Sequence, residues 1–284
     1  MTLMRAARPV VAVALLVGVA ACAERGGGTG SGAPATPSPA AATEGLVLRV
    51  DLTGGFAPPT VLAGRLPVVS VYADGRVISE GPVAAIYPGP ALPNLQVREI
   101  GPADVQDLVD RALAAGVAET SDLGSPSVAD APSTRFTVAT TTETYVREVY
   151  ALREAPDGSG LTAGQAEARG RLADLLTSLT DQAGGTAPYE AGAVSAVVSP
   201  WADPGDGLAQ PDEPWPGPSL PGEPLGGPPD ATCVTVTGTE AAALLGAARS
   251  ANAGTPWTTG DGARWSVTFR PLLPDETGCA DLTG

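Results

Sequence analysis

The sequence predicts an α+β fold, with a mostly antiparallel sheet of hairpins and helices packed on one face. Asp74-Gly75 lies between β-prone apolar stretches and predicts one hairpin, and residues 135–152, RFTVATTTETYVREVYAL, predict a second. Apolar residues recur at helical spacing after Gly101 and again after Thr162. Because the strands come mainly in hairpins, we expect antiparallel neighbours and helices on one side of the sheet.

Residues 46–52, LVLRVDL, alternate in polarity and predict a half-buried strand that opens the domain. We expect one of its faces to carry Leu46, Leu48, Val50 and Leu52.

The first hairpin follows. A two-residue type I′ turn at Asp74-Gly75 sets Val71 opposite Ile78 and Tyr72 opposite Val77. Both faces carry apolar pairs near the turn, so we expect the hairpin to be covered on both sides.

A proline-rich loop comes next in residues 80–94, EGPVAAIYPGPALPN. Proline fixes its own φ and biases the preceding residue toward extended geometry, so this loop is expected to be stiff. We take Tyr87, Pro88 and Pro90 as a candidate binding loop, because a preorganised loop loses little entropy on binding. The alternative is a purely structural connector.

Two helices are predicted from their caps and apolar stripes. Gly101-Pro102 opens the first, with proline at its favoured first position, after a short strand LQVREI. Thr162 and Gln165 form a capping box that starts the second. The expected core-facing residues are Val105, Leu108, Val109, Ala112 and Leu113 in the first helix, and Ala168, Leu172, Leu175, Leu176 and Leu179 in the second. The stretch GAVSAVVSPW is expected to be the last strand of a domain covering 46–200.

Residues 201–231 are dense in Pro and Gly with acidic residues, a composition that opposes a packed core and predicts a linker. The acidic residues there also permit a calcium loop, although their spacing does not match an EF-hand. Residues 232–284 predict a small strand-helix-strand unit, with Thr239 as the helix N-cap. Its second strand presents Trp265, Val267 and Phe269 on one face.

The N-terminus has the architecture of a lipoprotein signal. Arg5 and Arg8 precede an apolar run, and Val19-Ala20-Ala21-Cys22 resembles a bacterial lipobox. That resemblance implies removal of residues 1–21 and a diacylglycerol-modified Cys22, which anchors the chain in a membrane. An ordinary signal peptide with a chance cysteine is the alternative. Residues 22–45 are rich in Gly, Ser, Pro and Ala and predict a disordered tether.

The remaining cysteines, Cys233 and Cys279, flank the C-terminal unit. Exported chains favour disulfides, so we expect these two to pair and close that unit. Two separate buried thiols are the other possibility.

Composition excludes several kinds of chemistry. The chain has neither histidine nor lysine, which removes Ser-His-Asp triads, Cys-His pairs, Ser-Lys dyads, Schiff bases and histidine-bound zinc. Paired carboxylates remain, yet none sits in a recognisable motif. The formal charge of -15 disfavours nucleic acid as a partner. We therefore expect no enzymatic activity, cofactor or metal.

Three phrases, VYADGRVI, YPGPALPNLQVREI and WSVTFRPLLPDETGC, resemble an uncharacterised family of actinobacterial lipoproteins. This resemblance implies a lipid-anchored protein on the outer face of the cell membrane, with an envelope role or an extracytoplasmic protein partner. The layout of residues 46–183, with LRVDLTGGFAPP at its start, also resembles emfourin-type protease inhibitors. That second likeness implies inhibition of a secreted protease.

Overall fold

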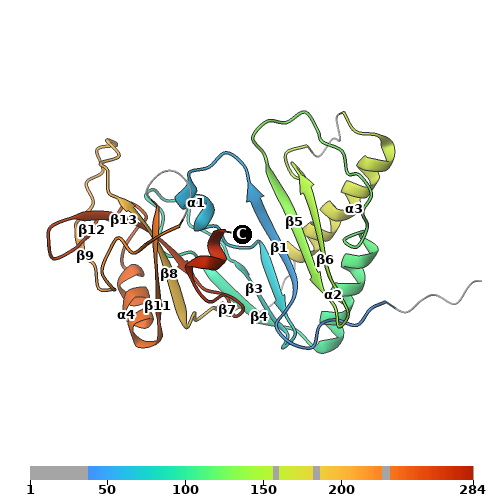
Figure 1. Ribbon diagram of the computed structural model, residues 1–284, viewed down its shortest axis with the longest axis horizontal. Helices are drawn as coiled ribbons and strands as arrows, with labels where there is room; N and C mark the ends of the chain where they lie inside the picture. Colours follow the sequence, from blue (N-terminus) through green and yellow to red (C-terminus); the bar gives the residue numbers. More distant parts are fainter. Residues whose placement is uncertain (1–37, 156–159, 182–185, 226–230, 284) are drawn as a thin grey trace, which may run out of the picture. The chain divides into compact units, whose positions relative to one another are not determined.

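The computed structural model describes residues 38–155, 160–181, 186–225 and 231–283. Contacts group these residues into one compact unit that begins at Ser38. The predicted signal peptide, Cys22 and the predicted tether up to residue 37 lie outside the described residues. The predicted α+β class is confirmed, since two mainly antiparallel sheets each carry helices (Figure 1).

The first sheet has the strand order β6-β5-β1-β2-β3-β4-β7, and all neighbouring strands in it are antiparallel. Its strands are β1 (Leu46–Gly54), β2 (Val69–Tyr72), β3 (Arg76–Glu80), β4 (Leu95–Glu99), β5 (Pro132–Ala139), β6 (Thr144–Tyr150) and β7 (Ala187–Pro188). Helices α2 (Pro102–Ala114) and α3 (Ala163–Thr180) lie together on one face of this sheet (Figure 1). The expected second hairpin is β5 and β6.

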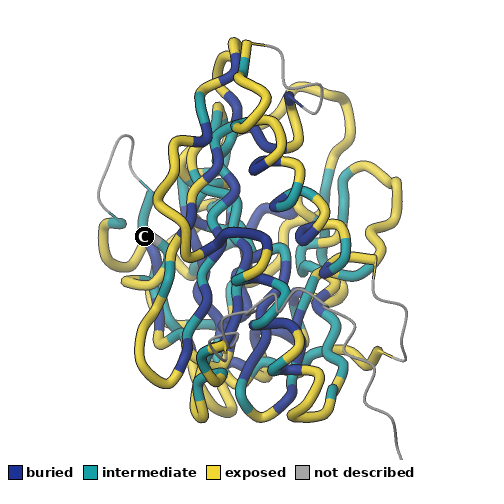
Figure 2. Tube along the Cα trace, turned by 90° about the vertical axis from the view of Figure 1, so that its right-hand side faces the viewer, coloured by how far each residue is buried: buried dark blue, intermediate teal, exposed yellow. Residues whose placement is uncertain are grey.

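The two long helices begin where their caps predict. The Thr162 hydroxyl accepts a hydrogen bond from the Gln165 backbone N–H at 3.3 Å, and the Gln165 side chain accepts one from the Thr162 N–H at 2.9 Å. This confirms the capping box, which satisfies two N–H groups that a helix start leaves without partners. The apolar stripes of both helices pack on the sheet in one core. In Figure 2 the buried residues lie mainly in the interior, and the exposed ones mainly in the outer loops.

The opposite face of the first sheet is covered by the end of the chain. Tyr72, Ile78 and Leu95 pack there with Leu273. The β2–β3 hairpin is thus covered on both sides, as its apolar pairs predict. This contact places residues 271–276 against β2, β3 and β4, which lie far earlier in the sequence.

A set of charged side chains, which we call the polar seam, joins that C-terminal segment to the sheet. The Asp275 carboxylate accepts hydrogen bonds from the Arg49 guanidinium and the Tyr72 hydroxyl, both at 2.7 Å. Beside them, the Arg270 guanidinium donates to the Glu276 carboxylate at 2.6 Å, and both side chains are buried. Pairing of these charges inside the molecule offsets the cost of removing them from water.

The second sheet has the order β10-β11-β8-β13-β12-β9, and only β9 and β12 run parallel among its described pairs. Its strands are β8 (Ala193–Pro200), β9 (Glu213–Pro214), β10 (Glu223–Pro224), β11 (Thr232–Thr237), β12 (Trp257–Thr258) and β13 (Arg264–Pro271). Helix α4 (Gly238–Ala248) packs on one face. The other face meets α1 (Pro59–Ala63) and the 3₁₀ turn η1 (Cys279–Thr283), through Ala63, Val197 and Cys279.

The disulfide expected between Cys233 and Cys279 is present. It ties β11 to η1 across 46 positions of sequence. Cys233 is buried, so the bridge lies within the core on the α1 side of the second sheet.

The register of the first hairpin differs from the prediction. Val71 pairs with Val77, and Ser70 pairs with Ile78, one position away from the expected partners. The turn has three residues: Gly75 has φ +88°, and its N–H bonds to the Tyr72 carbonyl. A left-handed glycine after a type I turn adds one residue to a two-residue loop, which shifts every pair.

The expected alternation of β1 also fails at its start. A β-bulge between Leu46 and Leu48 shifts the pairing with β2. As a result, Leu46 packs with Tyr72 and Ile78, whereas Leu48 lies in the core under the helices. The extra residue reverses which face Leu46 occupies.

The placement of β8 is a correction. We expected residues 193–200 to be the last strand of the first domain, but they form a central strand of the second sheet, between β11 and β13. The chain leaves β8 at residue 201 and pairs with it again as β11 from Thr232, so the described residues 201–225 lie between two neighbouring strands of one sheet rather than between two domains. Trp215 holds this segment in place, because its ring stacks on Phe269 and meets Trp257 in a T-shaped contact.

The start of α4 is displaced as well. Its N-cap is Thr237, two residues before the predicted Thr239. Gly238 has φ +62°, so it turns the chain directly from β11 into the helix.

Candidate functional site

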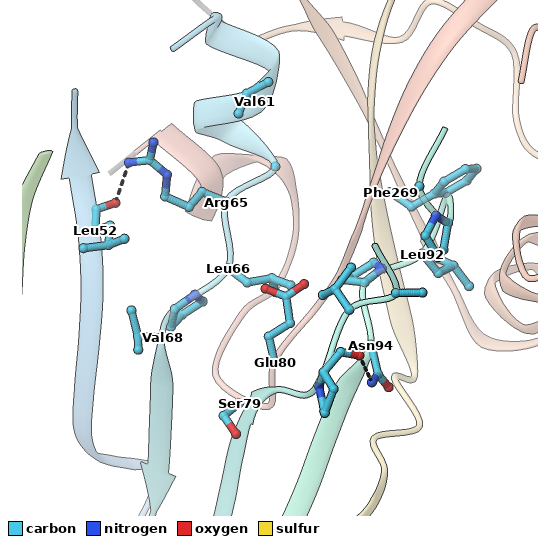
Figure 3. A pocket seen from close by; sticks show the side chains of 18 of the residues that line it. Leu52, Val61, Arg65, Leu66, Val68, Ser79, Glu80, Leu92, Asn94 and Phe269 are labelled. Carbon is cyan, nitrogen blue, oxygen red and sulfur yellow. Dashed lines mark hydrogen bonds between the residues drawn. The ribbon is translucent and has the colours of Figure 1, made fainter. Parts of the chain in front are cut away.

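The candidate binding loop, Pro82–Asn94, connects β3 to β4 and is closed at its base. The Gly81 N–H bonds to the Asn94 carbonyl at 2.7 Å, and the Asn94 side-chain amide donates to the Pro82 carbonyl at 2.8 Å. These two bonds hold the ends of the loop together, as Figure 3 shows for Asn94.

The middle of the same loop is fastened to the second sheet. The Ala253 N–H bonds to the Gly89 carbonyl at 2.8 Å, and Pro90 and Asn252 form an isolated β-bridge. The loop is therefore held at its base by the first sheet and at its centre by the connection between α4 and β12. Such double attachment restricts its conformation more than proline content alone.

The three residues predicted for this loop do not share one location. Tyr87 and Pro88 line a cavity beside the second sheet, whereas Pro90 lines a different cavity between the sheets. Tyr87 is 71% exposed, and its hydroxyl donates to the Asp206 carboxylate at 2.9 Å. That hydrogen bond with a carboxylate raises the pKa of Tyr87.

The first cavity encloses about 850 Å³ and lies between α1, the ends of β2 and β3, the Pro82–Asn94 loop and β13. Apolar side chains such as Leu66, Val68 and Leu92 line it. Figure 3 shows the Glu80 carboxylate pointing into the middle of this space, beside Leu66. Apolar side chains thus share the lining of this cavity with one acidic residue, Glu80, and two basic residues, Arg65 and Arg153.

Arg65 lies at the rim of this cavity but is turned away from it. Its guanidinium donates to the carbonyls of Leu52 and Gly54, both at 3.0 Å, and Figure 3 shows it directed toward Leu52. These bonds attach the segment after α1 to the end of β1. The Arg65 guanidinium is therefore engaged by backbone carbonyls rather than directed into the cavity.

The second cavity encloses about 680 Å³ between Tyr87, Pro88 and residues 201–210. Arg264 lies on its wall with its guanidinium carbon 3.9 Å from the centre of the Trp201 ring, a cation–π contact. The same guanidinium forms an ion pair with Asp212. Arg264 is therefore engaged on two sides, while Asp203 and Asp206 border the opening.

The sequence did not reveal that residues 201–210 accompany the Tyr87 loop. The joining hydrogen bond from Tyr87 to Asp206 spans 119 positions. The only local signal is an aromatic residue, Trp201, at the start of a stretch otherwise typical of a linker. Tertiary packing brings the two loops together, so no spacing of residues in the sequence predicts the contact between Tyr87 and Asp206.

The described residues contain no group of three or more acidic or cysteine side chains able to hold a metal ion. None of the helices in the described ranges is long and apolar enough to cross a membrane. Comparison with protein-family models, with curated proteins and with solved structures finds no match for this chain.

Proposed function

We propose that this chain is a lipid-anchored protein on the outer face of the cell membrane, where it binds a protein partner and catalyses no reaction. The observation that carries the binding role is the Pro82–Asn94 loop. It is hydrogen-bonded at its base and centre, while Ile86 and Tyr87 remain 62% and 71% exposed at its tip. Exposed apolar side chains on a fixed loop are the arrangement expected for a preorganised protein contact.

Two further features support the proposed location on the outer face of the membrane. The lipobox-like sequence ending at Cys22 supplies the modification site. The disulfide between Cys233 and Cys279 suits an oxidising compartment outside the cytoplasm.

Fractionation of the native host tests the anchor. We expect the wild-type protein in the membrane fraction, with an intact mass that includes acyl chains and one disulfide. The Cys22→Ala variant is expected to lack the acyl mass. Unacylated wild-type protein in the medium would overturn the anchor and leave a secreted factor.

A second proposal follows from the same loop and from the resemblance of residues 46–183 to emfourin-type proteins. A fixed loop with exposed Ile86 and Tyr87 suits insertion into the cleft of a secreted metalloprotease. The test is inhibition of a panel of such proteases by the chain lacking residues 1–22, with Tyr87→Ala as the loop variant. Inhibition that Tyr87→Ala weakens supports this proposal, and no inhibition across the panel removes it.

A further inference from the structure

The second cavity is held in shape by contacts among the residues that form it. The Trp201 N–H bonds to the Arg264 carbonyl at 3.0 Å, so the start of the 201–210 segment is attached to β13. The Asn252 side-chain amide donates to the Gln210 side-chain oxygen at 2.6 Å, so the end of that segment is attached to the connection after α4. The volume of about 680 Å³ falls within the range of small-ligand sites. The cavity therefore has a fixed shape and room for a ligand.

Tyr87 supplies this cavity with an aromatic ring that is both fixed and accessible. Its hydroxyl donates to the Asp206 carboxylate at 2.9 Å, and the loop that carries it is bonded at its base and centre. Tyr87 nevertheless remains 71% exposed where it lines the cavity. An accessible ring beside polar groups offers a flat apolar surface on which the C–H face of a sugar ring can pack.

The polar groups of the lining include both hydrogen-bond donors and acceptors. Asp203 holds its own turn through Oδ1, which accepts the Gly205 N–H at 2.9 Å, so its Oδ2 can accept from a ligand. Arg264 pairs with Asp212 through Nη2, and its guanidinium has further N–H donors. Ser266 adds a hydroxyl that can donate and accept. A ligand that matches this set carries groups that both donate and accept, as hydroxyls do.

The charges of the lining argue against an ionic ligand. Asp203, Asp206 and Arg264 are its charged residues, and Asp212 already neutralises Arg264. The two carboxylates repel an anion. A cation would meet the Arg264 guanidinium in the same cavity, and it would leave the donors of Arg264 and Ser266 without partners. A neutral ligand rich in hydroxyls uses the whole lining.

We propose that the second cavity binds a neutral saccharide. One sugar ring packs on Tyr87, and its hydroxyls bond to Asp203, Arg264 and Ser266. This inference goes beyond the proposed protein contact, because Ile86, the other exposed residue at the loop tip, is outside the lining of both cavities. It gives the chain a small-ligand site in a segment whose composition is typical of a linker.

Saturation-transfer difference NMR tests this proposal with the full chain, purified in a detergent that lacks a sugar headgroup. The probes are maltotriose, cellotriose, mannotriose, galactotriose and chitotriose, with spermidine as a cationic competitor. We expect saturation on the ring C–H protons of at least one trisaccharide, because those protons contact Tyr87. No saturation of any trisaccharide, or displacement of the bound sugar by spermidine, would overturn the proposal.

Titration calorimetry with the trisaccharide that binds then locates the site. Tyr87→Ala is expected to weaken the affinity about tenfold through loss of the ring contact, and Asp203→Asn by about threefold or more. Phe56→Ala is the matched control, because Phe56 is 91% exposed and outside the lining of both cavities. We expect it to change the affinity by less than about twofold. Equal affinities of Tyr87→Ala and Phe56→Ala would contradict this site.

Two further variants separate the contributions within the loop. Tyr87→Phe keeps the ring and removes the bond to Asp206, so it is expected to retain more affinity than Tyr87→Ala. If both variants bind equally weakly, the ring contact is not the source of the affinity, and the proposal fails. Equal urea midpoints of the variants ensure that the losses are local.

The saccharide site and the proposed protein contact fail separately. Ile86→Asp is expected to weaken a protein partner and to leave the saccharide affinity unchanged. If a protein partner is found and no trisaccharide binds, the proposed function stands and the saccharide site is wrong. If a trisaccharide binds and no protein partner is found, the saccharide site stands and the protein contact is wrong.

Discussion

The Asp275 carboxylate accepts a hydrogen bond from Arg49 at 2.7 Å, although 226 positions separate the two residues in the sequence. The same oxygen accepts from the Tyr72 hydroxyl, so one acidic group links β1, β2 and the segment after β13. This contact joins the last part of the chain to the first sheet. It is one of several contacts that join the two sheets, together with the bond from Tyr189 to the Leu272 carbonyl and the bridge between Pro90 and Asn252.

The buried pair beside it is the most sensitive point of the polar seam. Arg270 and Glu276 are only 3% and 8% exposed, and the Glu276 carboxylate also accepts from the Leu273 N–H at 2.7 Å. Glu276→Ala leaves a buried guanidinium without its counter-charge, so we expect a loss of about 3–5 kcal/mol in the free energy of unfolding. Urea denaturation monitored by tryptophan fluorescence measures it.

An exposed ion pair provides the control. Glu190→Ala removes the partner of Arg249, and both side chains are more than half exposed. We expect a change below about 1 kcal/mol, because water already solvates both charges. Equal losses for the two variants would contradict the role given to burial.

Asp51 on β1 gives a prediction about pH. Burial raises the pKa of Asp51 above its ordinary value, against the opposing effects of Arg49 and Arg135. The folded state therefore favours the protonated form, and ionised Asp51 lowers stability once the pH rises through its folded pKa. We expect Asp51→Asn to be more stable than wild type at pH 7.

That gain should vanish as the pH falls below about 4, the ordinary pKa of an aspartate, where Asp51 is protonated in both states. The measurement is the difference in urea midpoints between the two proteins at pH 7 and at pH 3. Destabilisation by Asp51→Asn at pH 7 would show that the neighbouring arginines outweigh burial.

The disulfide is expected to contribute strongly to stability. Cys233 and Cys279 close a loop of 46 positions, for which the chain-entropy model gives about 4 kcal/mol. Reduction of the wild-type protein should lower its free energy of unfolding by about that amount. The double variant Cys233→Ala/Cys279→Ala serves as the control, because its stability should not respond to the reductant. If the free energy of unfolding of the wild-type protein did not change with the reductant, the disulfide would have no stabilising role.

Gly75 in the first hairpin tests the three-residue turn. It has φ +88°, and a Cβ built there would lie 2.3 Å from the Ile100 carbonyl oxygen. Gly75→Ala is therefore expected to cost about 1–3 kcal/mol of stability through strain and overlap. Gly192→Ala is the matched control, because no atom lies within 4 Å of its Cβ position and its φ is not positive. Similar midpoints for both variants in urea would count against this turn.

Local signals in the sequence determined a large part of the fold. Thr162 and Gln165 cap α3 as predicted, and the apolar stripe through Leu172 and Leu176 packs on the sheet. The starts of α2 and α3 depend on contacts three or four residues apart, so they are readable without tertiary structure. The pairing of Cys233 with Cys279 was also expected from the sequence, with two separate thiols as the alternative, and the structure contains the disulfide.

At the candidate site, local sequence signals predicted the loop but not its long-range contacts. The proline content around Tyr87 predicted a stiff loop, and in the structure this loop is also attached by backbone hydrogen bonds to the carbonyls of Gly89 and Asn94. The sequence did not place Pro90 in a separate cavity or bring Asp206 to Tyr87. Those positions depend on how the second sheet lies against the first.

Only the tertiary structure decided how strands outside the two predicted hairpins pair. Residues 194–198 are buried on both faces, so their apolar run fits either sheet, and the contacts with β11 and β13 settle the choice. The bulge at Leu46–Leu48 depends in the same way on a partner strand farther along the chain, β2. A sequence specifies the period of a strand, whereas its neighbours are selected by the apolar faces that remain to be covered.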